Sequence, residues 1–186
     1  MHRDFKELLS ILNAEGVRYL VIGGYAVSLH AQPRATKDLD LLIKPDRNNA
    51  AALFRALANF GAPLEGLSST DFMEHGSFFR MGTPPVMVDI LPEIAGVVFD
   101  DVWERRVMAE IDAGTGLQAA FISADDLIIA KLASGRGQDL ADVEAVRKAQ
   151  KRTDEPVTRP TAGRRQIAAK RGGKTKLASK PRSVDF

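Results

Sequence analysis

The sequence predicts an α/β (α+β) protein in which helices flank a mixed central β-sheet. Segments with helical periodicity alternate with short apolar runs typical of buried strands, and a glycine pair separates one such run from the helix that follows it. A chain of 186 residues fits one domain with an appendage. We expect residues 1–150 to form the domain and residues 151–186 a basic tail.

The N-terminal part of the chain supplies a helix, a strand and the glycine pair. Apolar residues recur at helical spacing over residues 4–14, and residues 19–22 form an apolar run that predicts a buried strand. Residues 25–31 have helical composition, so Gly23 and Gly24 are expected at a strand-to-helix turn. Glycines let the backbone approach a ligand closely, and the first amides of a helix attract anions. The arrangement predicts a phosphate site.

Two carboxylates stand on the second predicted strand, residues 38–43. Asp38 and Asp40 lie at i and i+2 in a run of leucine and isoleucine, so on a strand both project from the same face. Such a pair can hold a divalent metal ion. The connection before the strand contains Arg34 and Lys37, which are expected either to contact phosphates or to be solvated.

The rest of the domain continues the alternation. Residues 61–75 lack periodicity and predict a loop near the substrate. Ser123 has an acidic residue three positions on, which predicts the start of a helix that breaks at residues 135–137 and resumes over 138–149. The other expected elements are helices at 48–60 and 99–108, strands at 78–81 and 86–91 that form a hairpin, and a strand at 117–122.

Asp89 interrupts the apolar run of residues 86–91. A carboxylate on a central strand is costly to bury unless a cation or a metal ion pairs with it. The alternative is an exposed position on an edge strand. The residues alone leave both positions open.

A second group of charged residues lies close to the end of the predicted domain. Lys131 and Arg136 are suited to meet a triphosphate or a developing negative charge. Asp139 and Asp142 share one helix face at i and i+3. Asp139 either positions Arg136, accepts a substrate proton or begins the helix, and for Asp142 a structural role is favoured slightly over a chemical one.

Gly23-Gly24, thirteen intervening residues and Asp38-x-Asp40 resemble the nucleotidyltransferase signature of the polymerase-beta-like superfamily. The segment from Lys131 to Asp142 resembles a second signature of the same group. Within the superfamily the chain most resembles the small bacterial nucleotidyltransferases grouped with the abortive-infection toxins. It departs from the pattern at Gly24, where many superfamily members carry serine.

The resemblance implies a nucleotidyltransferase fold and two-metal chemistry. A third carboxylate in the superfamily stands on the strand after the Asp-x-Asp unit, so Asp89 is expected to join Asp38 and Asp40 in binding Mg²⁺ or Mn²⁺. A nucleoside triphosphate such as ATP would give its monophosphate to a hydroxyl of RNA (tRNA included), a protein or a small molecule. The residues expected to act are Asp38, Asp40, Asp89 and Asp139 in catalysis and Gly23, Gly24, Lys37, Lys131 and Arg136 in donor binding.

Two roles remain open for such a protein. One is an active enzyme that serves as the toxin of a toxin–antitoxin pair, with a cognate antitoxin as partner. The other is a catalytically inactive nucleotide-binding or interaction module of such a system. A Rossmann dehydrogenase is disfavoured, since the glycine pair lacks the G-x-G-x-x-G spacing.

Composition and charge bound the cellular setting. The chain has no cysteine, which excludes disulfides and thiolate metal sites and suits a cytoplasmic protein. No signal peptide is evident, and no apolar run approaches the roughly 18 residues of a membrane span, so no membrane contact is expected. Residues 151–186 hold eleven Lys or Arg against three acidic residues, a net charge of +8, which leaves −6 for residues 1–150. We expect a disordered tail that either binds RNA or serves as a solubilising extension.

Overall fold

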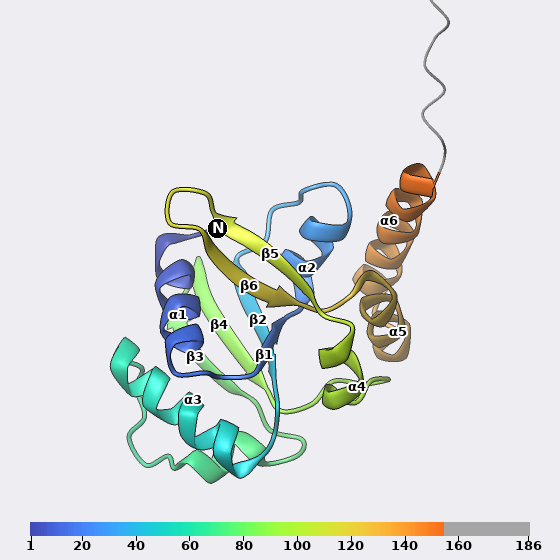
Figure 1. Ribbon diagram of the computed structural model, residues 1–186. Helices are drawn as coiled ribbons and strands as arrows, with labels where there is room; N and C mark the ends of the chain where they lie inside the picture. Colours follow the sequence, from blue (N-terminus) through green and yellow to red (C-terminus); the bar gives the residue numbers. More distant parts are fainter. Residues whose placement is uncertain (155–186) are drawn as a thin grey trace, which may run out of the picture. The chain divides into compact units, whose positions relative to one another are not determined.

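A six-stranded mixed β-sheet lies at the centre of the computed structural model, which describes residues 1–154 (Figure 1). These residues belong to one compact unit, Met1–Glu155. The strands are β1 (Tyr19–Val21), β2 (Asp38–Ile43), β3 (Phe79–Thr83), β4 (Val86–Leu91), β5 (Val107–Asp112) and β6 (Leu117–Phe121). The helices are α1 (Arg3–Ala14), α2 (Gly23–His30), α3 (Arg47–Phe60), α4 (Phe99–Glu104), α5 (Ala124–Ser134), α6 (Gly137–Asp154) and the short 3₁₀ helix η1 (Ser69–Met73).

The strand order is β3-β4-β2-β1-β6-β5, which places β2 and β4 inside the sheet. β2 runs parallel to β4 and antiparallel to β1, and β1 runs parallel to β6. β3 and β5 close the two edges as antiparallel hairpin partners of β4 and β6. The α/β fold with a mixed central sheet flanked by helices, predicted from the sequence, is confirmed.

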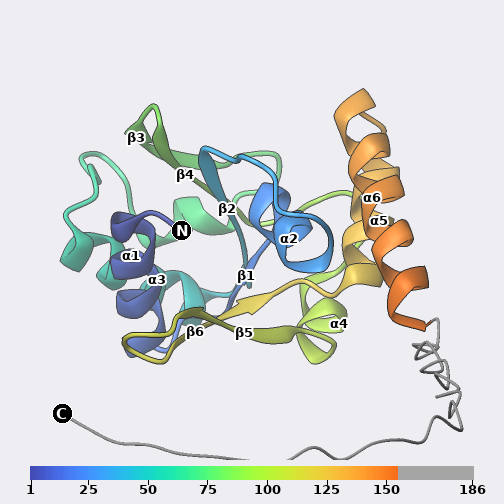
Figure 2. The same cartoon turned by 90° about the horizontal axis from the view of Figure 1, so that it is seen from above.

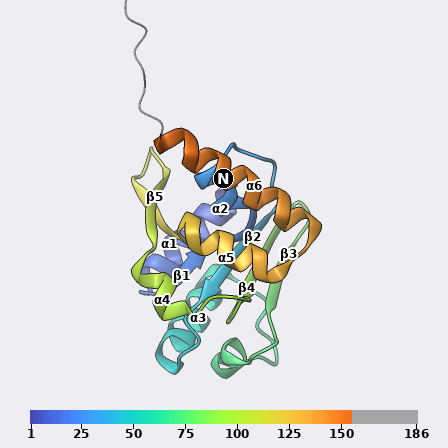
Figure 3. The ribbon, with the colours of Figure 1, turned by 90° about the vertical axis from the view of Figure 1, so that its right-hand side faces the viewer.

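Helices cover both faces of the sheet. Figure 2 shows α1 and α3 on one side and α2, α5 and α6 on the other. α2 contacts β2 directly, and α5 and α6 lie side by side and contact α2, so that the three helices form the second layer (Figure 3). The apolar face of α1 packs into the core, as its helical spacing predicts; its buried side chains are Phe5, Leu8, Leu9 and Leu12.

Local sequence signals set the helix ends near the site. The side chain of Asp46 accepts the backbone N–H of Asn49 and caps α3, which ends at Gly61 in the left-handed conformation. Ser123 caps α5 by accepting the N–H of Asp126, as predicted, and Gly135 ends that helix. The chain then turns and begins α6 at Gly137, so the predicted break between the two helices is confirmed.

Three expectations about local structure were wrong. The helix expected over 99–108 ends at Glu104, because residues 107–112 instead pair with β6 as the edge strand β5. The loop expected over 61–75 contains η1, which buries Phe72 between two other aromatic rings. The helix expected from residue 25 begins at Gly23, so both glycines belong to its first turn.

None of the described helices is long and apolar enough to cross a membrane. Residues 151–154 continue α6. The remainder of the predicted basic tail, and with it the expectation of disorder, lies outside the described residues.

Candidate functional site

Three aspartates from two neighbouring strands meet on one face of the sheet. Asp38 and Asp40 stand on β2, and Asp89 stands on β4 as the direct register partner of Asp40. Neighbouring positions in a parallel pair point to the same face. Asp89 is buried on an interior strand, whereas Asp38 and Asp40 are half-buried. The edge-strand alternative for Asp89 is therefore wrong.

The charges of these carboxylates act on one another. Burial, and after it the negative charges of Asp89 and Asp38, raise the pKa of Asp40 to about 6. The Lys131 ammonium group and a hydrogen bond from the Gly24 N–H act in the opposite direction but do not offset this. Nearby negative charges raise the proton affinity of this carboxylate, and a bound cation would reduce the repulsion between them.

Asp40 is expected to make the free energy of unfolding fall as the pH rises from about 4 to about 6. Its folded-state pKa lies above the ordinary 3.8, so the folded protein holds this proton more tightly than the unfolded chain does. That stabilisation is complete below about pH 4 and is lost as the pH passes the folded pKa. Asp40→Asn should remove this pH dependence and raise the free energy of unfolding at pH 7.5 by about 1–3 kcal/mol.

Urea unfolding in the presence of EDTA, at a series of pH values, measures this difference. The wild type and Asp40→Asn should have nearly equal stability below about pH 4, diverge as the pH rises above it, and keep a constant difference above about pH 6. Parallel stability curves for the two proteins over the whole range would contradict the role given to Asp40.

Gly23 is required by the close approach of α2 to Asp40. Its φ of 60° lies in the left-handed region, and a Cβ built there would overlap the Asp40 carboxylate, with Cγ only 2.7 Å away. The first turn of α2 therefore lies directly against the carboxylates. The group that the backbone approaches here is the side chain of Asp40, and the expected close approach to a phosphate stays a prediction.

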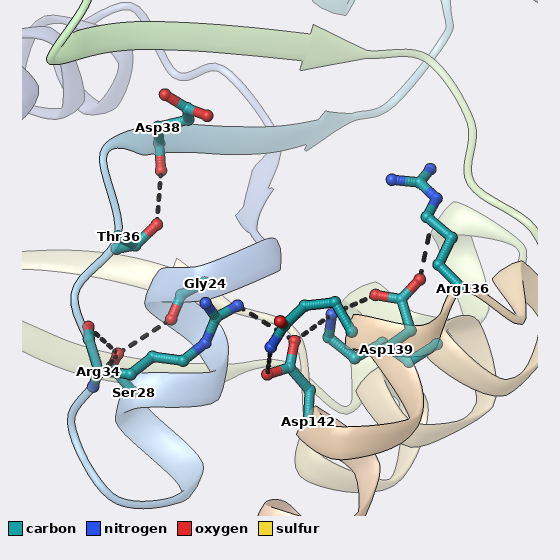
Figure 4. A network of polar contacts seen from close by, with 10 residues as sticks. Gly24, Ser28, Arg34, Thr36, Asp38, Arg136, Asp139 and Asp142 are labelled. Atoms are coloured by element: carbon teal, nitrogen blue, oxygen red, sulfur yellow. Dashed lines mark hydrogen bonds and ion pairs between the residues drawn. The ribbon is translucent and has the colours of Figure 1, made fainter.

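Gly24 faces Thr36, on the connection that leads into β2. A Cβ at position 24 would overlap the Thr36 hydroxyl and lie 2.7 Å from its Cβ. The Thr36 Oγ1 in turn donates to the Asp38 carbonyl at 3.4 Å (Figure 4). Thr36 thus fills the space that a serine at position 24 would need, which gives a physical reason for the departure from the superfamily pattern.

Gly24→Ala is expected to destabilise the protein by about 1–3 kcal/mol through this overlap. Thr36→Gly removes every Thr36 atom that the new methyl group would meet, so the double variant should lose less than the sum of the two single variants. A double-mutant cycle by urea unfolding measures the coupling. Strictly additive effects would show that Thr36 is not what excludes a side chain at position 24.

Lys131 is a cation that the structure holds near the three aspartates. It is mostly buried, and its Nζ lies 2.7 Å from Asp139 Oδ1 and 2.8 Å from Asp142 Oδ2. Asp142 also accepts from Arg34 Nη2 at 3.1 Å (Figure 4). The network joins α5, α6 and the connection before β2. It fixes the ammonium group at a place where its charge acts on Asp40.

Asp139 is held charged by its partners. Burial raises its pKa, but hydrogen bonds from Lys131 and Ser134 outweigh that and leave the pKa of this carboxyl below its ordinary range. Its nearest cation is Lys131, while Arg136 Nε lies 3.9 Å away with its side chain 82% exposed. Lys37 is also exposed. The structure thus gathers Lys131 and Asp139 around the site and leaves Arg136 and Lys37 facing solvent.

Sequence reasoning missed Arg80, the residue of β3 that pairs in register with Asp89. Its Nε and Nη2 donate to the two Asp89 oxygens at 2.7 and 2.6 Å. The position of Arg80 between Phe79 and Met81, in a hairpin that places it opposite Asp89, was the available signal. Sequence reasoning also did not predict that Asp142 bridges Arg34 and Lys131.

The carboxylate oxygens of Asp38 and Asp40 are suitable ligands for a divalent metal ion. No group of three or more His, Cys, Asp or Glu side chains within residues 1–154 is gathered closely enough to form a metal site as it stands. Both oxygens of Asp89 are engaged by Arg80. Asp89 therefore fits as a third ligand only when Arg80 shares or releases it.

Known proteins resemble this chain in sequence and in fold. Residues 2–157 match the model of a family described as nucleotidyltransferase of unknown function (DUF6036). No curated protein matches the sequence. The fold is similar to the lincomycin-bound lincosamide antibiotic adenylyltransferase LnuA, with a TM-score of 0.54 and 15% identity over 80% of this chain and 98% of that one. It is equally similar to TM1012, a candidate nucleotidyltransferase of Thermotoga maritima, with a TM-score of 0.54 and 18% identity over 81% and 92% of the two chains.

Proposed function

The chain belongs to this family of nucleotidyltransferases of unknown function, and from that premise we propose that it transfers a nucleoside monophosphate from a nucleoside triphosphate to an acceptor hydroxyl with the help of divalent metal ions. The observation that supports the proposal most strongly is that Asp38, Asp40 and Asp89 share one face of the sheet, with Asp40 directly against the first turn of α2. An acceptor oxygen would form a bond to the α-phosphorus, and the bond to pyrophosphate would break. The proton of the acceptor hydroxyl would pass to a nearby carboxylate or water molecule.

Each group at the site has a task in this reaction. Asp38 and Asp40, with Asp89, would hold Mg²⁺ or Mn²⁺, which supplies charge neutralisation at the phosphates and activation of the acceptor oxygen. The first turn of α2 at Gly23 and Gly24 is proposed to hold a phosphate oxygen beside the carboxylates, for which the Gly24 N–H would exchange its present partner, Asp40. Lys131, fixed by Asp139 and Asp142, is placed to stabilise negative charge on the triphosphate.

Arg136 and Lys37 are proposed as outer contacts. Both are exposed, and Arg136 is anchored only loosely by Asp139. A guanidinium group in that position suits bidentate contact with a phosphate of the donor or of the acceptor. Asp139 is proposed to position Lys131, because its lowered pKa makes it a weak proton acceptor.

Two observations support two different classes of acceptor. The name of LnuA says that it adenylylates a small antibiotic, which supports a small-molecule hydroxyl for a protein of the same fold. The net charge of +8 in residues 151–186 supports RNA instead, since clustered Lys and Arg bind phosphate backbones. The toxin role and a cognate antitoxin stay predictions from the resemblance.

The experiment incubates the protein with Mg²⁺ and each α-labelled nucleoside triphosphate in turn, together with RNA, protein and small-molecule fractions of a cell extract. Label that enters one fraction with wild type but not with Asp38→Asn/Asp40→Asn supports the proposal and identifies the acceptor class. Metal-dependent nucleotide binding without transfer into any fraction would favour the inactive binding module instead. The presence of all three carboxylates favours the enzyme.

A further inference from the structure

Arg80 forms an ion pair with Asp89, the third carboxylate of the proposed site. Its guanidinium group makes two hydrogen bonds to Asp89, with Asp89 12% and Arg80 51% exposed at the side chain. Arg80 stands on the edge strand β3, and the register of β3 with β4 sets it directly opposite Asp89.

The geometry gives Arg80 a choice of partners. The planar fork of arginine matches a phosphate as well as it matches a carboxylate, and it keeps its charge at any physiological pH. Half of its side chain is already exposed to solvent. A divalent metal ion and the guanidinium group would compete for the same two oxygens of Asp89, because each is attracted by the same negative charge.

We propose that Arg80 is a donor-binding residue, which neutralises Asp89 in the nucleotide-free protein and moves to the triphosphate when the metal-bound nucleotide takes Asp89. The inference rests on the proposed function, since it needs a metal-bound triphosphate beside the aspartates. It adds to that function a residue that lies outside both sequence signatures. It also explains why Asp89 can be buried before any metal arrives.

Arg105 provides a matched control. It donates to Asp126 in the same forked way, at 3.0 and 2.7 Å, with Arg105 56% and Asp126 3% exposed at the side chain. This pair connects the end of α4 to α5 and contacts none of the three aspartates in the described part of the chain. Arg80→Gln and Arg105→Gln therefore remove equivalent ion pairs from different places.

The first measurement is Mn²⁺ binding in the absence of nucleotide, with the free ion monitored by electron paramagnetic resonance. Arg80→Gln should bind Mn²⁺ about tenfold more tightly than wild type, because the competing cation is gone. Arg105→Gln should match wild type. Unchanged or weaker Mn²⁺ binding by Arg80→Gln would overturn the proposal.

The second measurement is the affinity for a non-hydrolysable nucleoside triphosphate in saturating Mg²⁺, by calorimetry. Arg80→Gln should bind the nucleotide about tenfold or more weakly, with Arg80→Lys intermediate and Arg105→Gln unchanged. The opposite signs of the metal and nucleotide effects distinguish this role from a structural one. Nucleotide binding by Arg80→Gln equal to wild type would overturn the proposal for Arg80 alone, whereas absence of binding by wild type would overturn the proposed function with it.

Discussion

Replacing Asp38 and Asp40 together with asparagine is expected to lower the rate of nucleotide transfer about a thousandfold or more while the protein stays folded. The two carboxylates are the proposed metal ligands, and removing them removes charge stabilisation worth several kcal/mol at the phosphates. Asparagine keeps the shape of the side chain, and the loss of mutual repulsion around Asp40 offsets lost hydrogen bonds. Initial rates of label transfer measure the effect, and circular dichroism checks the fold.

A control with the same change in net charge is Asp100→Asn/Asp101→Asn, which alters two exposed residues of α4. Transfer by this variant should stay within a factor of about two of wild type, since surface charges contribute little. If the Asp38/Asp40 variant kept a tenth or more of the wild-type rate, these two carboxylates would not be the metal ligands of the reaction.

Gly23→Ala is expected to cost stability and activity together. Alanine at a φ of 60° is strained by about 1–2 kcal/mol, and its Cβ would overlap the Asp40 carboxylate. Either α2 or Asp40 must move, and a displacement of about 1 Å in a reacting group can cost a hundredfold in rate. Urea unfolding and transfer rates should both be affected by this one methyl group.

Gly61→Ala separates the two causes. Gly61 also has a positive φ, at 84°, but a Cβ there would have no neighbour within 4 Å. This variant should show the backbone strain of about 1 kcal/mol and an unchanged transfer rate. Equal losses of transfer in Gly23→Ala and Gly61→Ala would mean that the contact between Gly23 and Asp40 has no part in the chemistry.

The strands and helices that build the site could be predicted from local sequence signals. The apolar runs around Asp38, Asp40 and Asp89 predicted strands, and the glycine pair marked the place where a helix approaches them. The helix expected at 48–60 is α3, which lies between β2 and the β3–β4 hairpin in the chain, and the parallel pairing of β4 with β2 sets Asp40 and Asp89 side by side. These features depend on residues close in sequence or on motifs with known spacing.

The contacts of the site could not be predicted in the same way. That Arg80 meets Asp89 depends on the register of a hairpin, and that Asp142 joins Arg34 to Lys131 depends on packing between segments about a hundred residues apart. The strand β5 was missed because none of its residues is buried, and pairing with β6 rather than an apolar pattern holds it in the sheet. Such features arise from tertiary structure.

We propose above all that a metal-bound triphosphate lies beside the aspartates and the first turn of α2. Crystals of the protein grown with Mn²⁺ and a non-hydrolysable nucleoside triphosphate test this directly, because the anomalous scattering of manganese locates the ion. We expect manganese bound by Asp38 and Asp40, phosphate oxygens beside Gly23 and Gly24, and Lys131 within reach of the phosphates. Manganese and nucleotide bound elsewhere on the protein, with Asp38 and Asp40 contacting neither, would contradict it.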